Sequence, residues 1–418
     1  MPRPVSRLVS ALVLATALIS LVGSLAPVAT ASSTTSVRDI TFTRWEGAAL
    51  AAGTNRGTVV TDAGVAFGTR TGKREYGGRS YERARWTGPW QMSSYSFTEL
   101  IASWQATTPG DSWIEVEVRG RNSKGVTASW DLLGRWTAGD RFVKRTSDSP
   151  QSDDLASVAV DTWRTGSVGL VSWQLRLSLY RKAGTAGPTV ASLGAMASRL
   201  PDNSRVPVST PGPSVGTVLD VPSYSQMAHA GHYPQWGGGG EAWCSPTSTS
   251  MVLGWYDALP PRSAYRFVPA GDPAPWVDHA ARRTYDAAYE GTGNWPFNTA
   301  YAAPLAGDAF VTRLRSLREA EEFIAAGIPL VASVSWGRGE LAGAHVASSD
   351  GHLVVIVGFT ASGDVVTNDP AAAKAAGVRT TYDRAQFENA WLPTSGGLVY
   401  VIHDDAHPLP PAPNQANW

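Results

Sequence analysis

The chain has 418 residues, no formal net charge, 43% hydrophobic residues and a single cysteine, Cys244. This composition excludes a disordered, collagen-like or coiled-coil chain, and the length predicts two globular domains that each bury a core. One cysteine excludes an intramolecular disulfide framework and a thiolate zinc cluster.

Residues 1–31 have the order of a secretory signal peptide. A short basic head precedes an apolar run at 8–25, and Ala-Thr-Ala at 29–31 is a small-residue cleavage site. We therefore expect a mature, secreted chain that begins near Ser32, with no later membrane span. The apolar run is also just long enough to cross a bilayer, so a membrane anchor is the alternative.

Residues 37–182 predict an all-β domain. Apolar and polar residues alternate in short runs, as at 113–119 and 172–180, and turn signals separate these runs. This pattern is typical of an antiparallel sandwich or jelly roll. Nine of the 17 Trp lie in this half, and we expect most of them in its core. Exposed Trp would instead suit a module that binds cell-wall sugars, which makes the cell wall a candidate partner of this domain.

The charge is divided unevenly along the chain. Residues 32–205 include 22 basic and 16 acidic side chains, whereas residues 206–418 include 11 and 19. Opposite net charges favour two domains that attract each other, and an uneven surface charge without a role is the alternative. Between them, 183–217 is rich in Gly, Pro, Ser and Thr and predicts a linker, although its apolar middle is able to pack.

Residues 218–405 predict an α+β domain, and 406–418 a proline-rich extended tail. The predicted elements of this domain are a strand at 218–226, a helix that begins at Cys244, a helix at 316–326 opened by the capping-box pair Ser316 and Glu319, strands at 328–336, 352–359 and 365–368, a helix capped by Asp383 that runs to Trp391, and a strand at 398–403.

Cys244 is the candidate nucleophile. It lies just before Pro246, a residue that suits the first turn of a helix, and the dipole at a helix N-terminus favours a thiolate. His352 opens an apolar strand and is the candidate base. A hairpin turn at 361–364 would bring Asp369, at the end of the next strand, close to His352, where a carboxylate can orient the imidazole.

Four motifs carry a resemblance to a known family. These are Val221-Pro222 followed by Gln226, Trp243-Cys244, Gly351-His352 and Asn368-Asp369-Pro370. Together they resemble the bacteriocin-processing (double-glycine leader) peptidase-like family of papain-like cysteine peptidases, over roughly residues 219–403. Residues 293–298 also resemble secreted actinobacterial members of that family.

The resemblance implies a secreted cysteine peptidase that acts on a peptide or protein. Cys244 would be its nucleophile, His352 its general base and Asp369 the group that orients His352, and Gln226 would donate to the oxyanion. Two departures stand out: Ser245 replaces the usual Gly, and Gln226 lies 18 residues before the cysteine, farther than is usual. Gln235 or a backbone amide is the alternative donor. The chain has neither a transporter span nor an ATP-binding loop, so a leader-cleaving role is not carried over.

Several alternatives stay open. His345 is a rival base, and Asn368 could orient His352 in place of Asp369. His229 and His232 lie in a Gly-rich loop with no carboxylate pattern, so no metal and no cofactor is predicted, and nothing indicates nucleic-acid binding. Tyr289, Trp295 and Phe297 either line a substrate cleft or pack in the core. A peptidoglycan amidase, an acyl transferase and a non-catalytic wall-binding protein are the alternative functions.

Overall fold

The computed structural model describes residues 37–148, 151–152, 154–201 and 205–418. The predicted signal peptide, residues 1–31, lies outside the described residues. Among the residues that are described, no helix is both long enough and apolar enough to cross a membrane.

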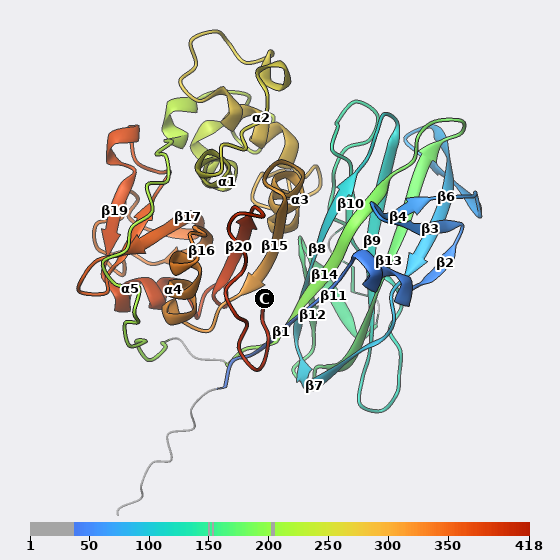
Figure 1. Ribbon diagram of the computed structural model, residues 1–418, viewed down its shortest axis with the longest axis horizontal. Coiled ribbons are helices and arrows are strands. Elements are labelled where there is room, and N and C mark those ends of the chain that lie inside the picture. Colours follow the sequence, from blue (N-terminus) through green and yellow to red (C-terminus); the bar gives the residue numbers. More distant parts are fainter. Residues whose placement is uncertain (1–36, 149–150, 153, 202–204) are drawn as a thin grey trace, which may run out of the picture. The chain divides into compact units, whose positions relative to one another are not determined.

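Two seven-stranded antiparallel sheets form the first half of the chain (Figure 1). The first sheet has the order β11-β12-β8-β14-β4-β3, and β1 also pairs with β14. The strands of this sheet are β1 (Asp39–Glu46), β3 (Thr58–Thr61), β4 (Gly64–Phe67), β8 (Glu99–Thr107), β11 (Ala156–Ala159), β12 (Thr162–Thr165) and β14 (Thr189–Arg199). The strands of the second sheet are β2 (Thr54–Arg56), β5 (Gly72–Tyr76), β6 (Arg79–Thr87), β7 (Gln91–Phe97), β9 (Ser112–Arg121), β10 (Asp131–Trp136) and β13 (Leu170–Lys182).

The tryptophans of this half mostly serve the core of the sandwich, as predicted. Seven of the nine are buried: Trp45, Trp86, Trp104, Trp113, Trp136, Trp163 and Trp173. The other two, Trp90 and Trp130, are half-buried and each lies under the guanidinium of Arg119. Their faces are therefore already engaged by cation–π contacts.

The apolar middle of the predicted linker at 183–217 packs, and it does so as a strand. Strand β14 lies inside it, pairs with both β8 and β1, and is almost entirely buried. The small residues that suggested a linker are needed for close packing. At Gly194, for example, a side-chain Cβ would lie 2.7 Å from the backbone oxygen of Thr43 on β1.

A six-stranded antiparallel sheet with helices on both faces forms the second half, so the predicted α+β class is confirmed. Its order is β15-β20-β16-β17-β18-β19. The strands are β15 (Asp308–Arg313), β16 (Leu330–Trp336), β17 (Ser349–Phe359), β18 (Val365–Asn368), β19 (Arg379–Tyr382) and β20 (Leu398–His403). The helices are α1 (Cys244–Trp255), α2 (Pro275–Thr284), α3 (Trp295–Ala306), α4 (Leu317–Ala325) and α5 (Arg384–Trp391).

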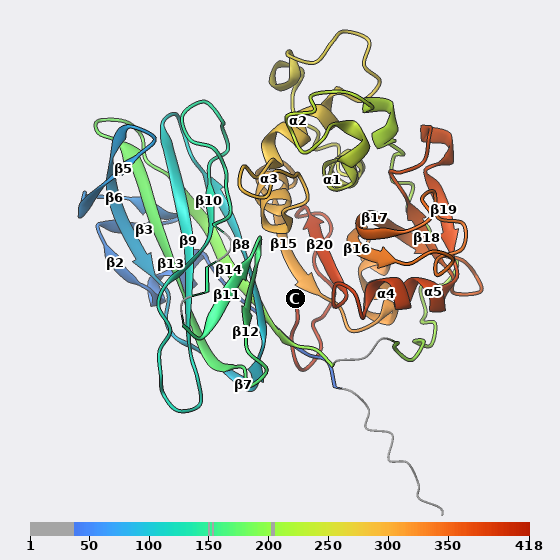
Figure 2. The same ribbon diagram turned by 180° about the vertical axis from the view of Figure 1, so that it is seen from behind.

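The alternation of the strands sends their side chains into two hydrophobic clusters. On β17, Val355 and Val357 join the cluster that includes α1 and α3, whereas Val354 and Ile356 join the cluster that includes α4 and α5. In Figures 1 and 2, α1 and α3 accordingly lie on one side of the sheet and α4 and α5 on the other. The sheet is thus buried on both faces.

Two local predictions in this half are wrong. Residues 218–226 form no strand: Val218 makes an isolated bridge to Gly358, and Gln226 begins a 3-10 turn (Gln226–His229). The capping box of α4 does not form either, because Ser316 makes no capping hydrogen bond. The amide of Leu317 is satisfied instead by Glu388 Oε1 of α5, a tertiary contact that the local sequence does not show.

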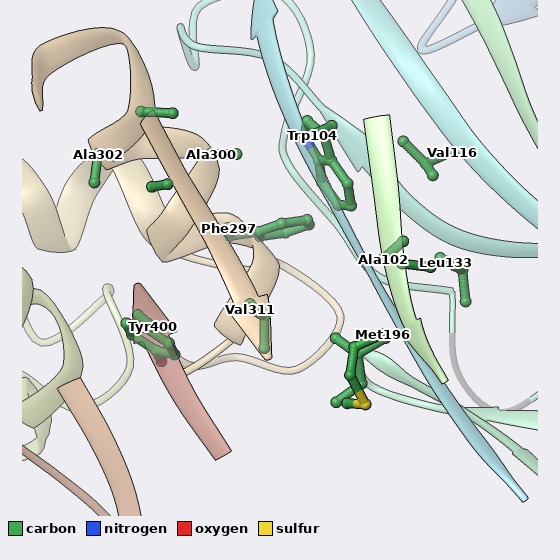
Figure 3. Packing of buried hydrophobic residues seen from close by; sticks show 14 of the residues in the cluster. Ala102, Trp104, Val116, Leu133, Met196, Phe297, Ala300, Ala302, Val311 and Tyr400 are labelled. Atoms are coloured by element: carbon green, nitrogen blue, oxygen red, sulfur yellow. The ribbon is translucent and has the colours of Figure 1, made fainter. Parts of the chain in front are cut away.

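One hydrophobic cluster spans both halves, and the second half also has a cluster of its own. Residues 37–418 form one compact unit, and a single cluster of buried residues includes strands of the sandwich and helices of the second half. Phe297 on α3 points toward Trp104 of the sandwich, at a ring-centroid distance of 6.1 Å (Figure 3). It also contacts Trp136 of the sandwich, at 5.4 Å. The tail at 406–418 has no helix or strand, and its Ala416 oxygen accepts a hydrogen bond from Phe42 N of β1.

Candidate active site

Cys244 is the first residue of α1, as predicted, and is partly exposed. Residues 245–253 of this helix are buried, and their run of small hydroxyl side chains allows close packing. Ser248 Oγ donates to the Leu353 oxygen on β17, and Ser250 Oγ to the Pro246 oxygen within the helix. The helix is therefore fixed against the sheet at the end that presents the thiol.

His352 and Asp369 lie on neighbouring strands and meet as predicted. His352 is in β17, and Asp369 directly follows β18, which is joined to β17 by the turn at 361–364. Asp369 Oδ1 lies 2.7 Å from His352 Nε2. The thiol of Cys244 lies beside the imidazole, and each of these two groups shifts the pKa of the other. The structure thus brings Cys244, His352 and Asp369 into one interacting series.

Two further side chains support this series, and sequence reasoning missed both. Tyr382 Oη of β19 donates to Asp369 Oδ2 at 2.7 Å, while the backbone amide of Ala371 donates to Oδ1. Trp336 of β16 packs edge-on against the His352 ring at 5.8 Å. Both depend on which strands pair in space, which a single sequence does not show.

The electrostatics of the series favour a charged pair. Burial by itself raises the pKa of the Cys244 thiol, but the hydrogen bond and positive charge of His352 outweigh it and hold the pKa below its usual value. Burial also disfavours the imidazolium, yet the Asp369 carboxylate raises the pKa of His352 well above its usual range. Against the same opposing effect of burial, His352 lowers the pKa of Asp369. A thiolate beside an imidazolium is the arrangement of an activated cysteine.

The rival residues are engaged elsewhere. His345 is exposed, and its Nε2 lies 3.1 Å from Thr380 Oγ1. Asn368 is buried, and its amide nitrogen donates to the backbone oxygens of Val221 and Pro222. Asn368 therefore anchors the segment before Gln226 and leaves Asp369 as the group that contacts His352.

A cleft of about 860 Å³ opens beside Cys244. One wall comes from β16, β17 and the segment 289–295, which contributes Tyr289 and Trp295. The sandwich also lines the cleft, through the β11–β12 hairpin with Val160 and Asp161 at its tip. Phe297, the third aromatic considered for the cleft, is instead a core residue of the shared interface.

The hairpin is tied directly to the second half. Asp161 Oδ2 accepts a hydrogen bond from the backbone amide of Trp295, the first residue of α3. Asn294 caps that helix by accepting from Phe297 N, and its amide donates to the buried Asp286. The stretch 293–298 therefore joins the sandwich to the second half at the edge of the cleft.

Comparison with protein families supports the same division of the chain. Residues 41–198 match the "Peptidase C39 N-terminal domain", and residues 218–399 match the "Peptidase_C39 like family". The chain belongs to the C39-like peptidases. The N-terminal match is to the actinobacterial type of this family. No curated protein matches the chain.

One departure of this C39-like peptidase from its family is explained by the structure. Ser245, at the position where Gly is usual, points into the core, and its Oγ lies 2.9 Å from the hydroxyl of Tyr400 on β20. Both side chains are buried. The serine therefore satisfies Tyr400 and does not enter the cleft.

Gln226 stands apart from the other predicted site residues of this C39-like peptidase. Its Nε2 donates to the backbone oxygen of Glu241 at 2.5 Å, and it is not among the residues that line the cleft. Its Oε1 has no hydrogen-bond partner among the described residues. Gln226 is thus linked to the segment that leads into Cys244, and its predicted role as oxyanion donor stays a prediction.

Proposed function

We propose that this chain is a secreted cysteine peptidase that hydrolyses peptide bonds with Cys244, His352 and Asp369 as its catalytic residues. The observation that carries the proposal is the His352–Asp369 hydrogen bond with Cys244 beside the imidazole, at a cleft of about 860 Å³ that Cys244 lines. The family supports a peptidase of the cysteine type. The geometry adds which groups would carry out each step.

The reaction begins when the Cys244 thiolate attacks the carbonyl carbon of the scissile amide and forms a C–S bond. His352, held as imidazolium by Asp369, gives its proton to the leaving amine as the C–N bond breaks. The product is a thioester on Cys244. His352 then takes a proton from water, the hydroxide attacks the thioester, and the C–S bond breaks to release the acid and restore the thiolate.

The negative oxygen of each tetrahedral intermediate needs donors. The backbone amide of Cys244 is suited to this because the first amides of a helix have no partner within it. Gln226 is the second donor that we propose, since one of its two amide hydrogens remains after the bond to Glu241.

The test compares the full chain with its Cys244→Ala variant on a library of peptides from a digested proteome. We expect cleavage by the wild type, read by mass spectrometry, and a loss of at least about a thousandfold in the variant. His407→Ala is the matched control, because His407 pairs with Asp404 and does not line the cleft. Intact peptides with the wild-type chain, together with cleaved stem peptides from purified peptidoglycan, would instead assign the chemistry to a cell-wall amide.

Secretion is tested separately. We propose that residues 1–31 direct export and are then removed. The intact mass of the chain recovered from culture medium should correspond to a start near Ser32. A full-length chain retained with membranes would contradict this and support the anchor.

A further inference from the structure

A second cluster of side chains capable of chemistry lies outside the cleft. His229 and His232, from the 3-10 turn and the loop after it, meet Asp272 and Asp278, from the loop before α2 and its first turn. One ligand atom from each residue lies within 4.8 Å of all the others. None of the four takes part in the proposed peptidase reaction.

Buried polar atoms in this cluster lack partners. His229 and Asp278 are fully buried, with no exposed surface. Among the described residues, neither ring nitrogen of His229 nor Oδ2 of Asp278 has a hydrogen-bond partner. His229 Nδ1 and Asp278 Oδ2 lie 2.9 Å apart, but they are not aligned as donor and acceptor. Such atoms, buried together and unsatisfied, would be costly unless something lies between them.

The charges in the cluster also favour a bound cation. Two carboxyl groups, those of Asp272 and Asp278, face two imidazoles, and both aspartate side chains are almost completely buried. Arg282, one turn further along α2, is engaged with Asp140. A divalent cation among the four side chains would offset both negative charges and give His229 Nδ1 and Asp278 Oδ2 a partner.

The spacing fits a small tetrahedral ion. The Nδ1 atom of His229 lies 2.9 and 3.5 Å from the Oδ2 atoms of Asp278 and Asp272. The Nδ1 atom of His232 lies 2.9 Å from Asp278 Oδ1 and 3.7 Å from Asp272 Oδ2. A zinc ion with bonds of about 2.0–2.1 Å separates its ligands by roughly 3.3–3.4 Å, in the middle of this range. Imidazole nitrogens also favour zinc over calcium or magnesium, which prefer oxygen ligands.

We propose that His229, His232, Asp272 and Asp278 bind one structural zinc ion. Four protein ligands leave no open position, as is typical of structural and not catalytic zinc. The ion would join α2 to the segment 229–243, which leads into the nucleophile. That segment is already tightly packed: a Cβ at Gly240 would lie 2.0 Å from the His229 oxygen, and Trp243 Nε1 donates to the Trp236 oxygen. Zinc would therefore fix the backbone on which Cys244 and the Gln226 contact depend.

The experiment measures metal and not peptidase activity, so its result is independent of the proposed function. The full chain, expressed with zinc in the medium, is dialysed and its metal content determined by plasma mass spectrometry. We expect about one zinc per chain, loss of most of it in Asp278→Asn, and full retention in His407→Ala, a histidine of the surface pair with Asp404. Asn keeps the shape of Asp278 but removes the charge that holds the cation.

A second measurement uses the wild type alone and so does not depend on folding of a variant. Zinc is removed with a chelator, and cobalt(II) is titrated into the chain. A tetrahedral site gives strong visible absorption that saturates at one cobalt per chain, and we expect added zinc to abolish it and to raise the melting temperature. Less than about 0.1 zinc per chain, or weak octahedral cobalt absorption with no thermal shift, would overturn the proposal. Equal zinc content in Asp278→Asn and wild type would do the same.

Discussion

Cys244 is subject to two opposing effects, and which of them prevails decides its reactivity. Burial raises the pKa of its thiol, whereas His352 lowers it by hydrogen bonding and by charge, and the net pKa lies below the usual value. Asp369 and Tyr382 contribute through His352, because they hold the partner that stabilises the thiolate. The reactivity of one side chain is thus set by residues on three strands.

The pH dependence of alkylation tests this balance. Because only the thiolate reacts, we expect iodoacetamide to modify Cys244 with a midpoint below about 8.5, the value of a free cysteine. In His352→Ala the lowering interactions are lost while much of the burial remains, so the midpoint should rise above that value. Mass spectrometry of the modified chain at several pH values provides the rates.

The matched variant for this measurement is His345→Ala. His345 is exposed, and its ring hydrogen-bonds to Thr380, which is not part of the series around Cys244. It should leave the midpoint where the wild type has it. A midpoint that rises with His345→Ala and stays fixed with His352→Ala would assign the base to the rival histidine.

The sequence predicted individual residues where they lie at the ends of elements. Cys244 before a helix, His352 opening a strand and Asp369 ending the next one are local signals, and a hairpin between the two strands follows from a short turn. Tyr382 and Asp278 carry no such signal. Tyr382 reaches Asp369 through pairing of β18 with β19, and Asp278 meets His232 across 46 residues of sequence.

The β11–β12 hairpin shows how one element serves the site at a cost in stability. Its tip residue Val160 has a φ of 58°, which is unfavourable for a β-branched side chain. The next residue, Asp161, is buried in the cleft wall, and burial raises the pKa of its carboxyl to about 6. Backbone strain and a buried carboxyl at the same hairpin tip both reduce stability. Such features are expected at a functional site, where the residues are selected for function and not for stability.

The variant Asp161→Asn tests this cost. The carboxyl loses its proton near pH 4 in the unfolded chain and near pH 6 in the folded one, so the native state of the wild type binds more protons between these values. The contribution of Asp161 to wild-type stability should therefore fall as the pH rises from 4 to 7. The free energy of unfolding of Asp161→Asn, measured with urea, should rise relative to the wild type by roughly 2–3 kcal/mol over the same interval.

The control for this series is Asp62→Asn, which changes an exposed aspartate in the turn between β3 and β4. Its stability relative to the wild type should be nearly constant with pH. A constant difference for Asp161→Asn as well would show that the Asp161 carboxyl is not desolvated by the fold.

For the molecule as a whole, the division into an all-β half and an α+β half could be predicted, but their union could not. The opposite net charges of the two halves do not explain it. Arg44 of the first half pairs with Asp308 of the second, but Asp140 and Glu99 of the first half pair with Arg282 and Arg313 of the second. The positions of individual charged side chains, and not the net charges of the halves, determine these ion pairs. The shared core includes Phe297. The sequence could not predict this, because an aromatic residue in that stretch is equally typical of the lining of a cleft.

The contacts of Phe297 lead to a prediction of how the whole chain unfolds. Because its ring lies between α3 and the sandwich residues Trp104 and Trp136, the two halves should unfold in one calorimetric transition. Phe297→Ala should lower the free energy of unfolding by about 3–5 kcal/mol and separate the transition into two.

Phe387→Ala is the matched control, since Phe387 is equally buried but packs within the second half alone. It should cost a similar free energy and keep one transition. Two transitions in the wild type would show that the halves fold independently. The same profile for both variants would show that Phe297 does not couple them.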